Sequence, residues 1–328
     1  MKQQEEEILL EVRNLKKYFP VAKRSLFSEQ QYAQAVDGVS FQVRKGKTLG
    51  IVGESGCGKT TIGRMIVQLT PATDGEILFE GRDILKCSRK EMKELRQKIQ
   101  FVFQDPYASL NPKMKIGDIL AEPMKLYHFA DKTNINEKVE KLLGLVGLPK
   151  EAAKRYPHEF SGGQRQRVGI ARALALNPQL IICDEPVSAL DVSIQSQIIN
   201  LLQELQRKFG LTYIFVAHGL NVVKHISDDV GVMYLGKMME LSPADELFEH
   251  PYHPYTRALL DAIPMPDPNL PSGEKILEGE VPGLVNIPKR CRFCTRCPFA
   301  QEKCFHEEPQ MQEISPNHQV ACHFPVLD

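Results

Sequence analysis

The sequence predicts an α/β fold in which helices cover a largely parallel β-sheet. Up to about residue 250, short apolar runs alternate with segments of helical periodicity, the pattern of strands joined by helices. The runs 49–52 and 180–183 are apolar throughout, which favours central strands buried on both faces. In 39–43, by contrast, Val and Phe alternate with polar residues, so we expect an antiparallel strand with one exposed face.

Helical periodicity marks the elements that follow. Apolar residues recur on one helix face between 194 and 205, which predicts a helix that covers the sheet. Two helix-like runs, 116–129 and 139–146, predict a mostly helical insertion at about 106–168. After residue 250 the chain becomes rich in proline, and periodicity ends soon after a last helix near 256–262. We therefore divide the chain into a first domain, 1–250, and a loop-rich extension, 251–328.

The overall composition excludes several classes of protein. Lys and Arg together number 41, as do Asp and Glu, so no net charge attracts nucleic acid or an anionic membrane. No apolar run approaches the roughly 20 residues that cross a bilayer. The first residues, MKQQEEE, are acidic where a signal peptide is basic, so we expect a cytoplasmic protein.

Residues 53–60 form a motif typical of phosphate binding. Their sequence, GESGCGKT, matches G-x-x-x-x-G-K-[ST] and stands between a buried strand and a helical run. Backbone N–H groups of such a loop face phosphates at a helix N-terminus, Lys59 reaches the β and γ phosphates, and Thr60 binds Mg²⁺. The expected nucleotide contacts are Gly53, Glu54, Ser55, Gly56, Cys57, Gly58, Lys59, Thr60 and Thr61.

The buried run 180–183 ends in two carboxylates, Asp184 and Glu185. Because a phosphate loop precedes them in the sequence, these two carboxylates are predicted to be the remaining catalytic groups of a nucleotide hydrolase. We expect Asp184 to hold Mg²⁺ through water, and Glu185 to orient and deprotonate the attacking water.

The segment 160–167, FSGGQRQR, resembles the signature motif of ATP-binding cassette ATPases. Gln104 in FQDP, the segment SALD at 188–191 and His218 resemble the other motifs of this family, in the expected order. The resemblance implies a RecA-like P-loop NTPase core with an antiparallel β subdomain and a helical signature subdomain. It also implies that two cassettes enclose two ATP molecules head to tail, with the signature of one subunit on the γ-phosphate held by the other.

Site residues follow from the same resemblance. Gln104 joins Thr60 and Asp184 as a Mg²⁺ ligand, and His218 joins Gln104 and Glu185 in the catalytic group. An aromatic residue near the end of the first strand stacks on adenine; Phe19 is favoured, with Tyr18 as the alternative. The remaining nucleotide contacts that the resemblance implies are Ser161, Gly162, Gly163, Gln164 and Asp191.

The chain beyond the cassette resembles the C-terminal extension of oligopeptide and dipeptide importer ATPases, in HPYTRALL at 253–260 and in CPFA at 297–300. EPVSALDVSIQ at 185–195 resembles the second of the two ATPase subunits of these importers. This implies an ATP-hydrolysing translocase, peripheral on the cytoplasmic face of the membrane, with a paralogous ATPase, two transmembrane subunits and, indirectly, an extracytoplasmic solute-binding protein as partners. The alternatives are a related importer of nickel or another solute, and a DNA-repair cassette.

Five of the eight cysteines lie in the last 38 residues. In a reducing compartment, such clustering predicts metal or iron-sulfur ligation before disulfides. The family resemblance implies a [4Fe–4S] cluster, with Cys294 as an extra thiol; zinc and unligated thiols are the alternatives. The implied cluster ligands are Cys291, Cys297, Cys304 and Cys322. The basic residues expected to offset thiolate charge are Lys289, Arg290, Arg292 and Arg296.

Overall fold

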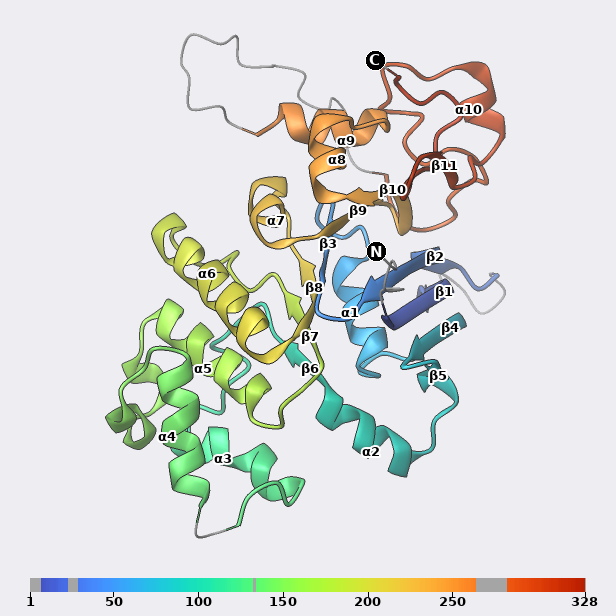
Figure 1. Ribbon diagram of the computed structural model, residues 1–328. Coiled ribbons are helices and arrows are strands. Elements are labelled where there is room, and N and C mark those ends of the chain that lie inside the picture. The colour runs from blue at the N-terminus through green and yellow to red at the C-terminus, as the bar shows by residue number, and fades with distance from the viewer. Residues whose placement is uncertain (1–6, 23–28, 132–133, 264–281, 328) are drawn as a thin grey trace, which may run out of the picture. The chain divides into compact units, whose positions relative to one another are not determined.

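The computed structural model describes residues 7–22, 29–131, 134–263 and 282–327 (Figure 1). They fall into two compact units. The first unit is made mostly of Arg44–Lys47 and Lys86–Val216. The second contains the described parts of Ile8–Val43, Thr48–Leu85 and Ala217–Asp328.

The first unit contains three parallel strands, β6 (Ile99–Val102), β7 (Leu180–Asp184) and β8 (Thr212–Val216), with β7 paired to both of the others. Every residue of β7 and β8 is buried, which confirms the prediction of a central strand at 180–183. Apolar side chains need cover on both faces of such strands. Helix α5 (Gly162–Leu174) packs on β6, and α6 (Val192–Phe209) packs on α5.

The segment between β6 and β7 in the first unit is mostly helical. Helices α3 (Ile116–Leu126) and α4 (Ile135–Leu145) pack on each other and on α5, and short 3-10 turns at Lys150–Lys154 and Pro157–Glu159 lead into α5. Helix α2 (Arg89–Lys98) precedes β6. The sequence placed the start of α4 four residues late, because its first turn carries only one buried apolar residue, Ile135.

The second unit contains a four-stranded sheet in the order β2-β1-β4-β5. Strand β4 pairs antiparallel with β1 and with β5. In β2, exposed Ser40 and Gln42 alternate with buried residues, which confirms the one-sided strand predicted at 39–43. The strand bounds are β1 (Ile8–Pro20), β2 (Tyr32–Arg44), β4 (Asp74–Phe79) and β5 (Arg82–Asp83), and a 3-10 turn follows at Ile84–Lys86.

The second unit also contains β3 (Thr48–Val52), which is buried throughout as predicted and runs parallel to β9 (Asp229–Tyr234). Strand β10 (Lys237–Pro243) pairs antiparallel with β9. Helices α1 (Lys59–Ile66) and α7 (Leu220–Ile226) belong to the same unit, and α7 packs on β3.

The extension is more ordered than the sequence indicated. Its helix α9 begins at Pro254 rather than near 256, and a proline suits the first turn of a helix because its missing N–H is not needed there. Strand β12 pairs antiparallel with β10 and with β11, so the extension adds strands to the sheet. These strands have three and four residues, too few to show a period of two. The remaining elements are α8 (Ala244–Glu249), α9 (Pro254–Asp261), α10 (Glu302–His306), β11 (Gln312–Ser315) and β12 (His318–Val320).

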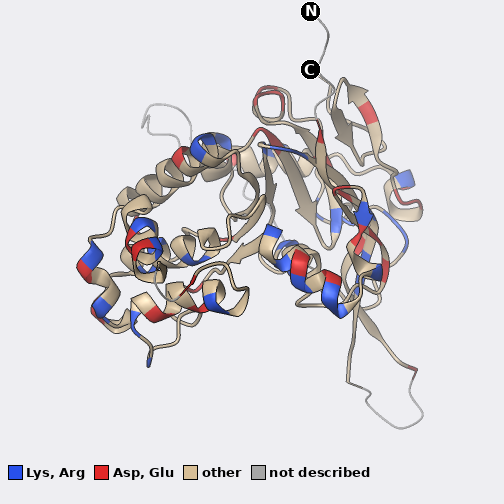
Figure 2. Ribbon diagram, turned by 60° about the horizontal axis from the view of Figure 1, so that its bottom comes forward, with Lys and Arg blue, Asp and Glu red and all other residues tan. Residues whose placement is uncertain are grey.

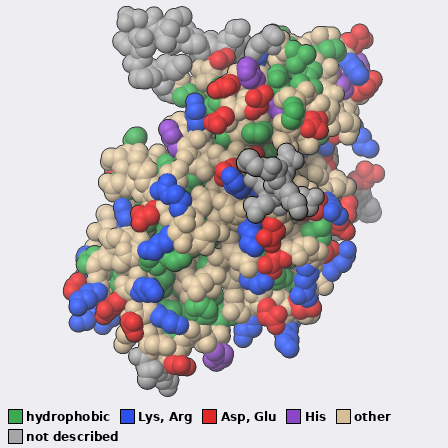
Figure 3. Space-filling view, viewed as in Figure 1, with side chains coloured by type: hydrophobic (Ala, Val, Ile, Leu, Met, Phe, Trp, Pro, Cys, Tyr) green, Lys and Arg blue, Asp and Glu red, His purple; other side chains and the backbone are tan. Residues whose placement is uncertain are grey.

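Charged side chains of both signs are interspersed along the helices (Figure 2), and the face in Figure 3 shows the same mixture with hydrophobic side chains between. This distribution agrees with the equal numbers of acidic and basic residues. In the described parts of the chain, no helix combines the length and the apolar character needed to span a membrane.

Candidate active site

The phosphate loop connects β3 to α1 in the second unit, and close packing requires glycine at two of its positions. Gly53 has φ +147°, and a Cβ atom there would lie 2.1 Å from the carbonyl oxygen of Met233. Gly58 has φ +108°, and a Cβ atom there would lie 2.1 Å from the carbonyl oxygen of Ala35. Any larger residue would displace backbone at both positions, so the loop keeps the tight curl that exposes its N–H groups.

The residue before α1, Gly58, offers no side chain to cap the helix, so the first N–H groups of α1 remain available to an anion. Lys59 is buried, and its Nζ donates to the carbonyl oxygens of Gly53 and Glu54 at 2.6 and 3.0 Å. The ammonium group therefore lies over the loop. Cys57 is also buried, and burial raises the pKa of its thiol, so this cysteine remains a neutral packing residue.

Asp184 is the last residue of β7 in the first unit and Glu185 directly follows it; both are almost fully buried. Gln104 Nε2 donates to Glu185 Oε2 at 2.6 Å, so two residues 81 positions apart meet. Glu185 has φ +47°, a sparsely populated conformation for a residue with a side chain, which persists only where the surrounding structure holds it. The structure thus brings together an amide and a carboxylate that can orient a water molecule.

Ser161 is the N-cap of α5, also in the first unit. Its Oγ accepts a hydrogen bond from Gln164 N at 3.3 Å, and Gln164 Oε1 accepts one from Ser161 N at 3.1 Å. This capping box leaves the hydroxyl proton of Ser161 free to donate to an anion. At Gly163 a Cβ atom would lie 2.5 Å from Ile194, so α6 requires glycine there.

The remaining predicted residues are placed as follows. Phe19 is 40% exposed near the end of β1, with Lys17 Nζ 4.9 Å from its ring centroid, whereas the Tyr18 hydroxyl donates to Asp37, so Phe19 is the more accessible of the two rings. His218 is exposed and lies two residues after the end of β8, and Asp191 is the N-cap of α6. Phe19 and His218 belong to the second unit with the phosphate loop, and Asp191 to the first with Gln104 and Glu185.

The phosphate loop has two partners that sequence reasoning did not identify. Arg296 pairs with both carboxylate oxygens of Glu54, at 2.8 and 3.0 Å. Tyr255 Oη accepts a hydrogen bond from Glu54 N at 3.0 Å. These residues lie 242 and 201 positions from Glu54, and no local motif signals such pairings.

The five cysteines of the extension line one small cavity in the second unit, together with His253 and Phe293. Burial raises the pKa of the Cys291, Cys297 and Cys322 thiols to about 11, so they are protonated at neutral pH in this arrangement. Within the described residues, no three His, Cys, Asp or Glu side chains converge as ligands of one metal ion.

The basic residues near the cysteines do not act as a group. Arg292 pairs with Asp37 and Arg296 with Glu54, so two of the four residues expected to offset thiolate charge neutralise carboxylates instead. Arg290 stacks on Phe305, with 5.9 Å from its Cζ to the ring centroid. Burial raises the pKa of Cys294, and the nearby Arg290 charge opposes that effect.

Comparison with known proteins decides the family. Residues 36–188 match the family model described as ABC transporter, and residues 239–304 match that of the oligopeptide/dipeptide transporter C-terminal region. Oligopeptide transport ATP-binding protein AppF of Bacillus subtilis (strain 168) is 54% identical over 97% of this chain and 98% of its own length. The chain belongs to the family of oligopeptide transport ATP-binding proteins. Another relative, OppF of Escherichia coli (strain K12), is 52% identical over 96% of both chains.

Solved structures agree with this family assignment and fold. A dimeric ATP-binding cassette in a post-hydrolysis state bound to ADP and Pi is 27% identical, with a TM-score of 0.64, and covers 72% of this chain and 98% of its own. The cbiO1 protein of Clostridium perfringens is 29% identical at the same TM-score, over 74% of this chain and 92% of its own. This family member is thus an ABC ATPase with a cassette fold.

Proposed function

We propose that this chain is the ATP-hydrolysing subunit that powers import of oligopeptides or dipeptides across a membrane. The observation that carries the proposal is the 54% identity to an oligopeptide transport ATP-binding protein over 97% of the chain, which includes the extension. Two further proposals concern its organisation: a cassette of 1–250 with a helical insertion near 106–168, and a distinct extension of 251–328. The relatives named for oligopeptide transport favour peptide over nickel as cargo, and the neutral charge balance disfavours a DNA-repair role.

The chemistry assigned to each residue follows from its position. Lys59 and the N–H groups at the start of α1 bind the terminal phosphates, and Phe19 stacks on adenine. Thr60 would help to hold Mg²⁺, which would neutralise phosphate charge. Glu185 takes the proton of the attacking water, and Gln104 holds the Glu185 carboxylate in place through their 2.6 Å hydrogen bond.

We propose that the complete site needs a second ATPase subunit, a paralogue of this chain. Ser161 is exposed at the start of α5, and the two glycines after it leave the helix N-terminus unobstructed. An anion is favoured there because the N–H groups and the helix dipole point toward it. In a head-to-tail pair of ATPase subunits, each ATP site would be shared by both subunits. The N-terminus of α5 and His218 would contact the γ-phosphate in these composite sites.

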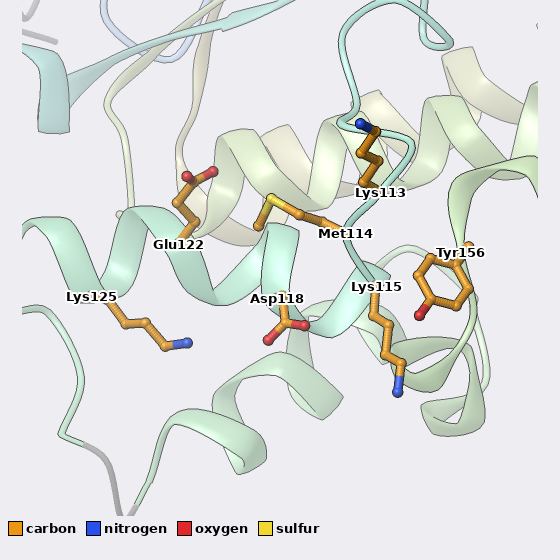
Figure 4. A pocket seen from close by; sticks show the side chains of 7 residues that line it. All are labelled: Lys113, Met114, Lys115, Asp118, Glu122, Lys125 and Tyr156. Carbon is orange, nitrogen blue, oxygen red and sulfur yellow. The ribbon is translucent and has the colours of Figure 1, made fainter.

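A cavity in the first unit is suited to a membrane subunit. It lies on α3 and the loop before it, in the segment that follows Gln104 (Figure 4). Its lining carries charges of both signs, which favours an amphipathic helix with polar groups of both signs. The charged residues are Lys113, Lys115, Asp118, Glu122 and Lys125. We propose that it receives a cytoplasmic helix of one of two transmembrane subunits, which places the chain on the cytoplasmic face of the membrane and lets it serve an extracytoplasmic solute-binding protein.

We also propose that the cysteine cavity holds a [4Fe–4S] cluster through Cys291, Cys297, Cys304 and Cys322. The support is that all five thiols line one cavity. Zinc bound by the same thiols is the alternative, because four cysteines also suit a tetrahedral zinc site. The cluster would supply cross-links to a segment with little regular structure.

The test is Glu185→Gln in the assembled transporter, reconstituted in vesicles with a labelled peptide. Glutamine keeps the shape of the side chain but cannot accept a proton, so we expect ATP hydrolysis and peptide uptake to fall roughly 10²- to 10⁴-fold while ATP binding persists. Exposed Glu204→Gln on α6 is the control and should transport normally. Uptake that continues in Glu185→Gln at the wild-type rate would contradict the assigned mechanism.

A further inference from the structure

Arg296 links the cysteine segment to the phosphate loop. Its guanidinium forms a two-bond pair with the Glu54 carboxylate, and Nη1 also donates to the Tyr234 hydroxyl at 3.2 Å. The Arg296 side chain is only 5% exposed, compared with 23% for Glu54. The hydrogen bond to Glu54 raises the pKa of Arg296 above its ordinary value, so the guanidinium stays charged.

The same loop residue is held through its backbone. Tyr255 is fully buried, and its hydroxyl accepts from Glu54 N. Its ring packs against Tyr234 and Phe293, with centroids 4.8 and 5.3 Å away. Phe293 stands between two cysteines of the cavity and Arg296 directly precedes a third, so the segment that lines the cavity also fixes both contacts to Glu54.

The charge of Glu54 explains why this pairing affects nucleotide binding. A carboxylate in a loop that binds a polyphosphate repels the ligand unless a cation neutralises it. Lys59 already faces the loop carbonyls, so it does not replace Arg296 at the Glu54 carboxylate. A planar guanidinium on both oxygens cancels the charge and also fixes the side-chain direction.

We propose that Arg296 is a positioning residue of the phosphate loop, through which the cysteine extension sets the affinity for ATP. Arg296 acts on Glu54 rather than on the nucleotide. The inference rests on the proposed nucleotide site and adds to it a determinant that lies outside every cassette motif. It follows that disorder in the segment 291–297 weakens ATP binding even when the cassette motifs are intact.

The test compares Arg296→Gln, Glu54→Gln and the double variant in the full-length protein. Binding of Mg²⁺ and a fluorescent ATP analogue is measured at equilibrium, and KM and kcat are measured in the assembled transporter. Arg296→Gln leaves Glu54 unpaired, so we expect Kd and KM to rise roughly tenfold or more with kcat little changed. In the double variant the unpaired charge is gone, so its Kd should return to within about threefold of that of Glu54→Gln.

Two further variants separate charge from folding. Arg296→Lys keeps a cation but loses the two-bond geometry, so its Kd should lie between those of wild type and Arg296→Gln. Lys303→Gln, in an exposed ion pair with Glu307 of the same extension, should leave Kd unchanged. Thermal unfolding of the nucleotide-free variants gives their stability independently, and a folding defect alone would not be repaired by Glu54→Gln.

The inference would be overturned if Arg296→Gln bound the ATP analogue with the Kd of wild type, or if the double variant bound it as weakly as Arg296→Gln. Neither result would contradict the proposed nucleotide site. A wild-type protein that does not bind Mg·ATP would overturn both.

Discussion

Asp37 shows how a single carboxylate fastens distant parts of the second unit. It accepts hydrogen bonds from the Tyr18 hydroxyl and from Arg292, and Lys237 Nζ lies 3.2 Å from it. Burial by itself raises the pKa of Asp37, but the Tyr18 hydrogen bond and the charges of Lys237 and Arg292 outweigh it, so the pKa lies below its ordinary value of 3.8.

A carboxyl group whose pKa is lower in the folded than in the unfolded state stabilises the folded state at pH values above its unfolded-state pKa. This stabilisation is lost as the pH falls through its folded-state pKa. We therefore expect Asp37→Asn to lower the free energy of unfolding by about 1–3 kcal/mol at pH 7. The difference from wild type should narrow as the pH falls below 3.8, as urea denaturation at a series of pH values would show. Asp74→Asn, at an exposed ion pair with Lys16, is the control and should change stability less. A constant difference between pH 7 and pH 3 would contradict this account.

At the scale of elements, two helices carry the same N-terminal cap but have different proposed roles. In α2, Ser88 Oγ accepts from Glu91 N at 3.4 Å and Glu91 Oε2 accepts from Ser88 N at 2.7 Å. In α5, Ser161 and Gln164 form the same capping box. Comparing the two helices separates the loss of stability caused by removing a cap from any loss of ATPase activity.

We expect Ser88→Ala and Ser161→Ala each to lower the free energy of unfolding by about 1 kcal/mol. Only Ser161→Ala should also reduce ATP hydrolysis by the assembled transporter, because only α5 is proposed to face a nucleotide. Denaturant unfolding and steady-state ATPase assays measure the two effects. Equal loss of ATPase activity in both variants would show that the cap of α5 has no role beyond stability.

At the scale of the whole molecule, the cysteine cavity gathers residues from across the extension, from His253 to Phe324. After anaerobic purification we expect iron and acid-labile sulfide, which Cys294→Ser retains and Cys297→Ser loses. Because burial raises the pKa of three of the thiols to about 11, loading must release protons and should weaken as the pH falls. Stoichiometric zinc without sulfide in the purified protein would show that the site binds zinc instead of a cluster. Loss of iron in Cys294→Ser would contradict the proposed ligand set.

The composite site makes a prediction about assembly. A strictly monomeric preparation should bind Mg·ATP but hydrolyse it slowly, because the N-terminus of α5 contacts nucleotide only across a pair of subunits. Adding the paralogous ATPase and the membrane subunits should raise turnover, which a phosphate-release assay measures with gel filtration to fix the oligomeric state. Rapid turnover by the monomer would show that one chain holds a complete site.

The sequence by itself determined the local parts of this protein. The phosphate loop, the carboxylates that end β7 and the capped start of α5 are each set within a few consecutive residues, because backbone curl, strand burial and helix capping depend on near neighbours. The buried strands β3 and β7 and the one-sided β2 follow from apolar periodicity for the same reason. The family followed from the order of these motifs along the chain.

Only the tertiary structure decided which distant residues meet. The extension was expected to be an appendage of loops, and it instead adds β12 to β10 and places Arg296 on Glu54, 242 residues away. The arginines near the cysteines were expected to offset thiolate charge, yet the buried side chains of Arg292 and Arg296 pair with the carboxylates of Asp37 and Glu54. Charge and spacing indicate that a residue needs a partner, but the choice of partner depends on the packing of the folded chain, since a buried ion pair forms only where the fold brings both groups together.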